Sequence, residues 1–166
     1  MSSGGFFNRL AGFISQKYVY LFICLLVLGG AALADFFILG NDRRTMVFYT
    51  AKEGNPVIEE RMIPHSGFRE EEITRYVNEV LLGPVVLDIA PLFPEGTRLE
   101  SLLYRDKEVF VNLSESAALA PLDGIQDVKT NLYTLVLGIH RNFNYIKKVT
   151  LFVHGNEVFF EEFADI

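Results

Sequence analysis

The stretch that decides the fold runs from residue 70 to residue 84 and reads Glu70-Glu71-Glu72-Ile73-Thr74-Arg75-Tyr76-Val77-Asn78-Glu79-Val80-Leu81-Leu82-Gly83-Pro84. Its apolar side chains recur with the spacing of one helix face, at Ile73, Tyr76, Val77, Val80 and Leu81. Ser66 is the expected cap, the acidic triplet favours a solvated first turn, and Gly83-Pro84 ends the helix. The stretch therefore predicts an amphipathic helix that packs by one face.

Short segments of alternating polarity on both sides of this helix predict strands joined in hairpins. A second helix is expected to begin at Asp123, its cap, and to run to about Asn142 with a single apolar stripe. Asp106-Lys107 and Gly155-Asn156 are the expected two-residue turns. The predicted strands are 46–50, 57–63, 99–105, 108–113, 149–153 and 157–161.

The expected order of elements is ββαββαββ, which gives an α+β domain. Because each helix has one apolar face, both helices are expected to pack on one face of one mostly antiparallel sheet. The compact domain is assigned to residues 45–166, after a short polar linker at residues 40–44.

An apolar segment precedes this domain. Residues 18–34 carry no charge, and Phe36-Phe37-Ile38-Leu39 follows Asp35. This length predicts a transmembrane helix at residues 18–39, after a cytoplasmic segment at residues 1–17. The expected anchor residues are Tyr18, Tyr20, Leu21, Phe22, Leu25, Leu26, Val27 and Leu28.

Two questions about this segment stay open in the sequence. Ala32-Leu33-Ala34 has the pattern of a signal-peptidase site, so cleavage after Ala34 competes with a retained anchor. The long segment before the apolar run favours retention. Basic residues lie on both sides of it, so charge does not settle the orientation. The early start of the run favours a single-pass protein of the inner membrane with its C-terminal domain outside the cytoplasm.

Charge and composition exclude several function classes. The formal net charge is −6, and an acidic domain repels both nucleic-acid phosphates and anionic lipid. His65, His140 and His154 fall in separate elements, so no metal site and no cofactor are expected. No nucleophile elbow or other catalytic constellation is present, and the sequence therefore predicts that the protein is not an enzyme.

Three spaced motifs carry a resemblance to a known family. Tyr76 to Pro84 ends in Leu-Leu-Gly-Pro, Pro91 to Leu99 contains Pro-x-Gly-Thr, and Val109-Phe110-Val111-Asn112-Leu113-Ser114 is a Val-x-Val-Asn-Leu-Ser strand. With Thr134-Leu135 and the segment 149–158, this order resembles the GerMN domain family of bacterial sporulation and germination proteins. The resemblance covers about residues 46–159 in a single copy.

The resemblance implies an extracytoplasmic envelope domain with no catalytic residues. It also implies a fold similar to the ring-building modules of secretion machinery. The expected partners are therefore other envelope proteins, and the resemblance is also compatible with peptidoglycan as a partner and with an oligomeric state. The leading hypothesis is a non-catalytic, membrane-anchored scaffold module of a bacterial envelope complex. The alternative is a peptidoglycan- or glycan-binding module.

A candidate partner surface follows from the alternation of strand residues. If Val109, Val111 and Leu113 face the helices, Phe110 and Asn112 face away. The same argument places Phe152 and His154 on the helix-free face. An uncovered apolar face marks an interface. The competing interpretation is that the linker or the segment 85–92 covers it.

Overall fold

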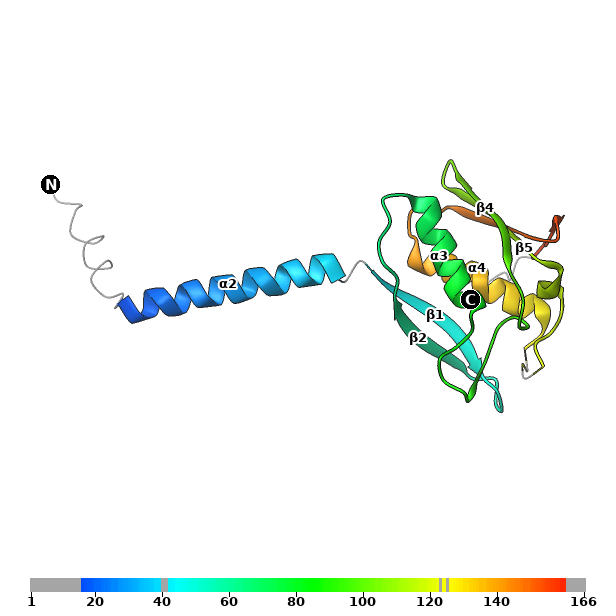
Figure 1. Cartoon of the computed structure of the whole chain (residues 1–166), viewed down its shortest axis with the longest axis horizontal. Helices are drawn as coiled ribbons and strands as arrows, with labels where there is room; N and C mark the ends of the chain where they lie inside the picture. Colours follow the sequence, from blue (N-terminus) through cyan, green and yellow to red (C-terminus); the bar gives the residue numbers. More distant parts are fainter. Residues whose placement is uncertain (1–15, 40–41, 123, 125, 161–166) are drawn as a thin grey trace. The chain divides into compact units, whose positions relative to one another are not determined.

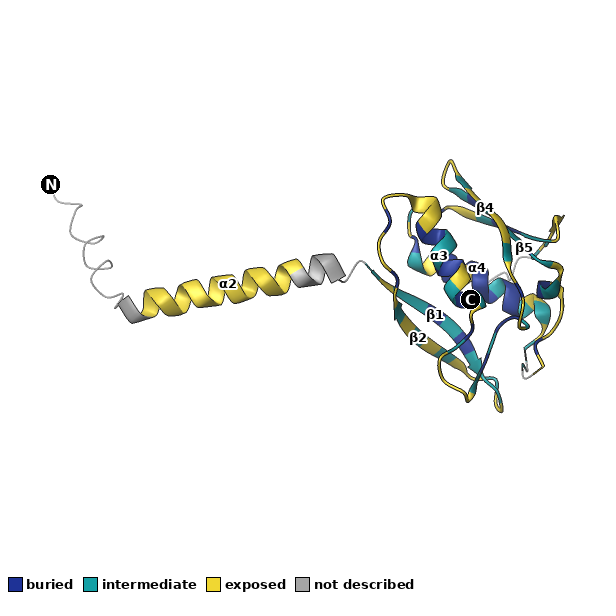
Figure 2. Ribbon diagram, in the orientation of Figure 1, coloured by how far each residue is buried: buried dark blue, intermediate teal, exposed yellow. Residues whose placement is uncertain are grey.

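The chain divides into two compact units, residues 1–41 and 42–166. The computed structural model describes residues 16–39, 42–122, 124 and 126–160. In the first unit, the predicted segment 18–39 is helical and forms α2, Gln16–Leu39 (Figure 1). Its side chains from Tyr18 to Ala34 are exposed (Figure 2). Among the described residues, no helix combines the length and the apolar character needed to cross a bilayer.

The second unit contains the predicted helices and the first two predicted hairpins, with one short strand in addition. The last strand is only Asn156–Glu157 rather than the predicted 157–161, of which residue 161 lies outside the described residues. The first strand begins at Arg43, so the last two residues of the predicted linker belong to the sheet. The elements are β1 Arg43–Thr50, β2 Pro56–Met62, α3 Arg69–Leu81, β3 Ile89–Ala90, β4 Leu99–Arg105, β5 Glu108–Leu113, the 3₁₀ helix η1 Glu115–Ala118, α4 Val128–Asn142, β6 Lys148–Val153 and β7 Asn156–Glu157.

The strands form two sheets, so the prediction of one sheet with both helices on one face is wrong. The first sheet has the order β2-β1-β3 and the second the order β4-β5-β6-β7. All strand pairs are antiparallel except β5 and β6, which run parallel on either side of the α4 crossover. The α+β class and the mostly antiparallel pairing are confirmed.

The reason for two sheets lies at the second edge of β1. There β3 pairs only with Tyr49 and Thr50. Nearer the start of β1, the side-chain amide of Asn142 in α4 takes the place of a strand. Asn142 Oδ1 accepts the Thr45 N–H at 2.8 Å, and Asn142 Nδ2 donates to the Thr45 carbonyl at 2.7 Å. The edge is therefore satisfied by a helix, and the first sheet ends there.

Both helices contact the two sheets. α3 contacts β4, α4 contacts β1 and β6, and the helices contact each other. Tyr76 of α3 is 1% exposed and reaches across α4 to within 3.3 Å of the Thr45 carbonyl oxygen. A Cβ on Gly138 of α4 would lie 2.3 Å from the Tyr76 hydroxyl, so this crossing requires glycine. The fully buried side chains include Met46, Phe48, Ile73, Val77, Val109, Val111, Leu113, Leu135, Ile139, Phe143 and Leu151.

The helix caps differ from the predicted ones. α4 begins at Val128 and is capped by Asp127, whose Oδ1 accepts the Thr130 N–H at 2.7 Å. The predicted cap, Asp123, lies outside the described residues. α3 begins after Phe68, which makes no side-chain capping bond. Ser66 is instead a partner of two glutamates, because the chain between it and α3 is extended.

The hairpin turns place non-glycine residues in the left-handed region. Asp106 and Lys107 have φ of 53° and 68°. His154 and Gly155, with φ of 50° and 77°, form the last turn one residue earlier than predicted. Positive φ at both central positions matches the twist of two-residue hairpins, which is why these turns connect adjacent strands directly.

Candidate functional site

The helix-free face of the second sheet contains the predicted surface residues. Strand register places Leu103 beside Phe110, and Phe110 beside Thr150. Phe152 lies beside Asn112 on the same face. The alternate residues of β5 point inward and are fully buried. We call Leu103, Phe110, Thr150 and Phe152 the outer face.

The outer face is apolar but only half covered. Leu103 is 53% exposed, and Phe110 and Phe152 are half-buried. Thr150 between them is buried, and its hydroxyl has no hydrogen-bond partner among the described residues. Neither α3 nor α4 covers this face, because both contact the opposite side of the sheet. The face can bury further apolar area against another surface.

Asn112 and His154, the other two predicted surface residues, lie at one end of this face. Asn112 Oδ1 accepts the Gly155 N–H at 3.0 Å, and its Nδ2 donates to Glu100 Oε2 at 3.0 Å. His154 is exposed in the turn, with Nδ1 3.8 Å from Glu100 Oε1. The Asn112 amide therefore fastens the last hairpin turn to the sheet, a role that alternation alone does not reveal.

A cleft of about 720 Å³ lies between the end of α3 and the loop before β4. Its two walls are the Leu-Leu-Gly-Pro and Pro-x-Gly-Thr motifs. Gly83 has φ of +83°, and a Cβ there would lie 3.3 Å from Pro91 Cβ, so the glycine lets the two motifs meet. The lining residues include Asn78, Leu82, Phe93, Glu95, Arg98 and Leu99. The cleft lining is mostly apolar and carries one amide, one carboxylate and one guanidinium.

The Thr97 hydroxyl closes the loop of this cleft. Thr97 is buried and donates both its N–H, at 3.1 Å, and its hydroxyl, at 2.8 Å, to the Pro94 carbonyl. Gly96 between them has φ of +86°. These bonds explain the motif spacing, since glycine provides the positive φ and threonine the second donor.

Arg61, which sequence reasoning missed, joins β2 to the end of α3. Its guanidinium donates to the carbonyls of Glu79 at 3.0 Å and Gly83 at 2.5 Å. It also pairs with Glu59 at 2.7 Å and with the Glu79 carboxylate at 3.0 Å. A cation beside the last carbonyls of a helix complements the helix dipole. This network fixes one wall of the cleft.

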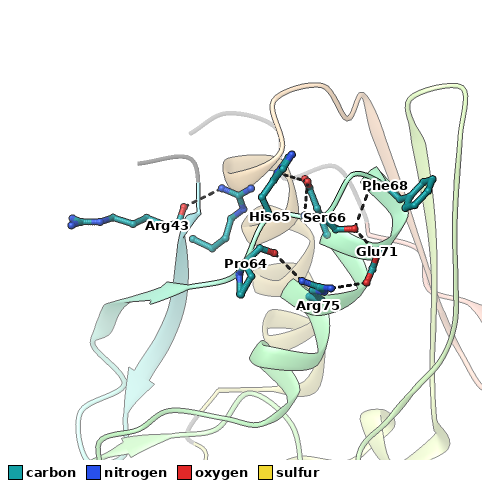
Figure 3. Close-up of polar contacts among 9 residues, drawn as sticks. Arg43, Pro64, His65, Ser66, Phe68, Glu71 and Arg75 are labelled. Carbon is teal, nitrogen blue, oxygen red and sulfur yellow. Dashed lines mark hydrogen bonds and ion pairs between the residues drawn. The ribbon is translucent and has the colours of Figure 1, made fainter. Parts of the chain in front are cut away.

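Glu71 of the acidic triplet lies in a polar cluster with Ser66 and Arg75 at the start of α3 (Figure 3). Glu72 is buried rather than solvated, with Oε1 2.5 Å from His65 Nδ1. The Ser66 hydroxyl donates to Glu71, and Arg75 pairs with the same carboxylate at 2.6 Å. The Ser66 hydrogen bond, and then Arg75, hold the pKa of Glu71 below its ordinary value. The prediction of a solvated first turn is therefore wrong for Glu72.

These polar groups hold structure together and form no reactive constellation among the described residues. No group of three or more His, Cys, Asp or Glu side chains in the described ranges could hold a metal ion. Burial, and then the Glu72 charge, raise the pKa of Tyr145 to about 12. Burial likewise raises the pKa of Tyr76. Both tyrosines stay protonated at neutral pH, so neither acts as a base.

A model of the family described as "Germane: Sporulation and spore germination" matches residues 46–159. The chain belongs to the Germane family. The matched range is the one over which the sequence resembles GerMN domains, so that interpretation is confirmed. The motifs that carry it are the two walls of the cleft and β5. None of the curated proteins matches this Germane chain.

Solved structures share the fold at low identity. The tandem GerMN domains of the sporulation protein GerM from Bacillus subtilis match with a TM-score of 0.51 at 20% identity, over 69% of this chain and 39% of that one. This chain therefore spans about two fifths of the tandem structure. The first GerMN domain of the same protein matches with a TM-score of 0.50 at 20% identity, over 69% and 85% of the chains. A putative lipoprotein from Clostridium perfringens matches at 24% identity over 70% and 76%, with a TM-score of 0.46.

Proposed function

We propose that this Germane-family chain is a non-catalytic interaction module of a bacterial envelope complex, held at the inner membrane by α2 with its domain outside the cytoplasm. The outer face carries the proposal, because Leu103, Phe110 and Phe152 are apolar and neither helix packs on them. The expected partners are other envelope proteins, including further copies of this chain.

Anchoring by α2 is inferred from the sequence, since no helix among the described residues has both the length and the apolar character of a membrane span. Residues 18–34 are uncharged, and their side chains are exposed rather than packed in a core. Full-length protein with a C-terminal epitope is expected to resist alkaline extraction from membranes. A shortened, extractable band would instead mean cleavage after Ala34.

The interface is tested by site-specific photo-cross-linking in cells, with a probe at Phe110. Discrete larger species are expected, and mass spectrometry then names the partner. Phe110→Glu is expected to abolish partner capture without unfolding the domain, since the Phe110 side chain lies outside the core. Ile58→Glu, at a 53% exposed site on the first sheet, is the matched control and is expected to keep capture. Normal capture by the Phe110 variant would sink the proposal.

Peptidoglycan or glycan binding is the second candidate, favoured by the cleft. Asn78, Glu95 and Arg98 provide amide, carboxylate and guanidinium groups of the kind that bind sugar hydroxyls. Under this alternative, the chain co-sediments with purified cell wall, and Asn78→Ala combined with Glu95→Gln abolishes the co-sedimentation. Absence of wild-type co-sedimentation removes this candidate and leaves the first untouched.

A further inference from the structure

Charge is unevenly distributed along the strands of the domain. We call the end at which β1 begins the proximal end, and the end with the β1–β2 turn the distal end. Strand register and helix contacts place the following basic residues at the proximal end: Arg43, Arg44, Arg69, Arg105, Lys107, Arg141, Lys147 and Lys148. The distal end is acidic and carries Glu53, Asp88, Glu95, Glu100, Glu115, Asp127 and Glu157.

Most of the acidic groups at the proximal end are already engaged within the domain. Glu70 accepts the Tyr104 N–H at 3.0 Å, Glu71 pairs with Arg75, and Glu72 is buried against His65. Asp106 Oδ2 lies 3.3 Å from Arg105 Nε, whereas Glu108 is only the register partner of Lys148 on the neighbouring strand. Asp42 and Glu60 complete the set. These seven acidic groups stand against nine basic ones, the eight residues above and Arg75, so the proximal end has a small net positive charge.

Three lysines concentrate this charge at one tip. The Lys147 N–H donates to the Lys107 carbonyl at 2.8 Å, and Lys148 is the next residue. All three are exposed, and none forms an ion pair within the described residues. Lys107 sits at φ of 68°, a conformation that glycine adopts freely and lysine rarely. The chain thus keeps a cation where the backbone favours glycine, and such an outlier points to function.

Aromatic groups line the same end. Phe68, just before α3, is 75% exposed. Beside it, the Arg69 guanidinium lies 4.7 Å from the Tyr145 ring centroid and donates to the Tyr104 hydroxyl at 3.1 Å. Arg44 lies 5.2 Å from the Phe143 ring centroid. An exposed aromatic side chain within a basic surface is typical of contact with a lipid interface.

We propose that the proximal end docks on anionic lipid headgroups. The proposal rests on the proposed anchor, because only residues 40–42 separate α2 from β1, and a tether of this length keeps the proximal end at high effective concentration near the bilayer. The sequence-based prediction that this acidic domain repels anionic lipid assumed that its charge is evenly distributed over the surface. The domain as a whole is acidic, but its proximal end is net positive. That end therefore attracts the anionic headgroups that the whole domain repels.

The test uses the full chain in lipid vesicles with a quencher on the headgroup. In a Cys24→Ser background, a fluorophore is placed at Asn144→Cys, at the exposed proximal end, or at Lys52→Cys, at the distal end. Quenching of the Asn144 probe is expected with one-third phosphatidylglycerol and absent with pure phosphatidylcholine. It should disappear at high salt, and the Lys52 probe should stay unquenched. Equal quenching on both lipids would overturn the proposal.

Charge variants sharpen the result. Lys107→Gly combined with Lys147→Ser and Lys148→Ser is expected to lower the docking equilibrium constant roughly a hundredfold, since each basic residue near an anionic surface contributes about a factor of five. Lys107→Gly also relieves the strained turn, so loss of docking cannot be ascribed to unfolding, and a melting curve checks this. Lys52→Ser with Lys129→Ser removes distal cations and is expected to leave docking unchanged. Unchanged docking in the lysine variant would overturn the proposal.

Failure of the anchor gives a different signature. Flotation with phosphatidylcholine vesicles at high salt reports insertion of α2 alone, because neither charge nor anionic lipid contributes there. If the chain does not float under these conditions, the anchor proposal is wrong. Its salt-sensitive contact with phosphatidylglycerol vesicles still tests the docking surface.

Discussion

The two sheets of the domain are closed in different ways. In the first sheet, side chains bond backbone groups that have no strand partner. Asn142 bonds the edge of β1, and Arg61 joins β2 to the end of α3. In the second sheet, the strand β7 pairs with the edge of β6, and Asn112 secures only a surface turn. Side-chain polar groups are therefore essential to the first sheet and peripheral to the second, whose outer face neither helix covers.

The largest effect is expected from the amide at the edge of β1. Asn142→Ala leaves the Thr45 N–H of a half-buried strand without a partner and its carbonyl with the Tyr76 hydroxyl alone. Unsatisfied buried groups of this kind are expected to lower the free energy of unfolding by about 3 kcal/mol. Urea denaturation measures the loss. A change under about 1 kcal/mol would mean that β1 needs no partner at this edge.

The second expected effect concerns the crossing of the two helices. Gly138→Ala places a Cβ against the Tyr76 hydroxyl, and this overpacking is expected to lower the free energy of unfolding by about 2 kcal/mol. Tyr76→Phe removes the clashing oxygen, so the double variant is expected to recover most of the loss. A double-mutant cycle checks this coupling, and simple additivity of the two changes would contradict it.

A smaller effect is expected for the matched asparagine of the second sheet. Asn112→Ala breaks two hydrogen bonds that involve exposed groups, so water replaces the lost partners. The free energy of unfolding is expected to fall by about 1 kcal/mol. Amide hydrogen exchange should show faster exchange at Gly155 and unchanged protection in β5. Loss of protection throughout β5 would mean that Asn112 supports the sheet as Asn142 does.

The smallest effect is an acid dependence. Hydrogen bonding to Ser66 and pairing with Arg75 depress the pKa of Glu71 in the folded state, so its contribution is present above the unfolded value of 4.5 and is lost as pH falls below it. Glu71→Gln is expected to flatten the fall in melting temperature over this range. An unchanged slope would assign the acid sensitivity to other carboxylates, such as Asp127, whose pKa is also lowered.

Local patterns predicted the elements because they depend on neighbours in the chain. The spacing of Ile73, Tyr76 and Val77 defines α3, and the alternation in β5 correctly separates Val109 from Phe110. The same alternation placed the outer face, although it did not reveal that Asn112 binds Gly155.

What could not be predicted depends on residues far apart in sequence. Asn142 and Thr45 are 97 positions apart, and nothing near either residue shows that a helix will seal a strand edge. The division into two sheets follows from that contact and so stayed hidden. The separation of charge was missed for the same reason, because it exists only after folding brings the turn at Lys107 beside Lys147.

The amide of Asn142 has a further consequence for how copies of this protein can meet. An unpaired strand edge is a template onto which another chain can add, and repeated addition leads to fibrils. By occupying the start of β1, Asn142 removes that template from the middle of the first sheet. The start of β1 is thereby closed to strand addition by a second copy of the chain.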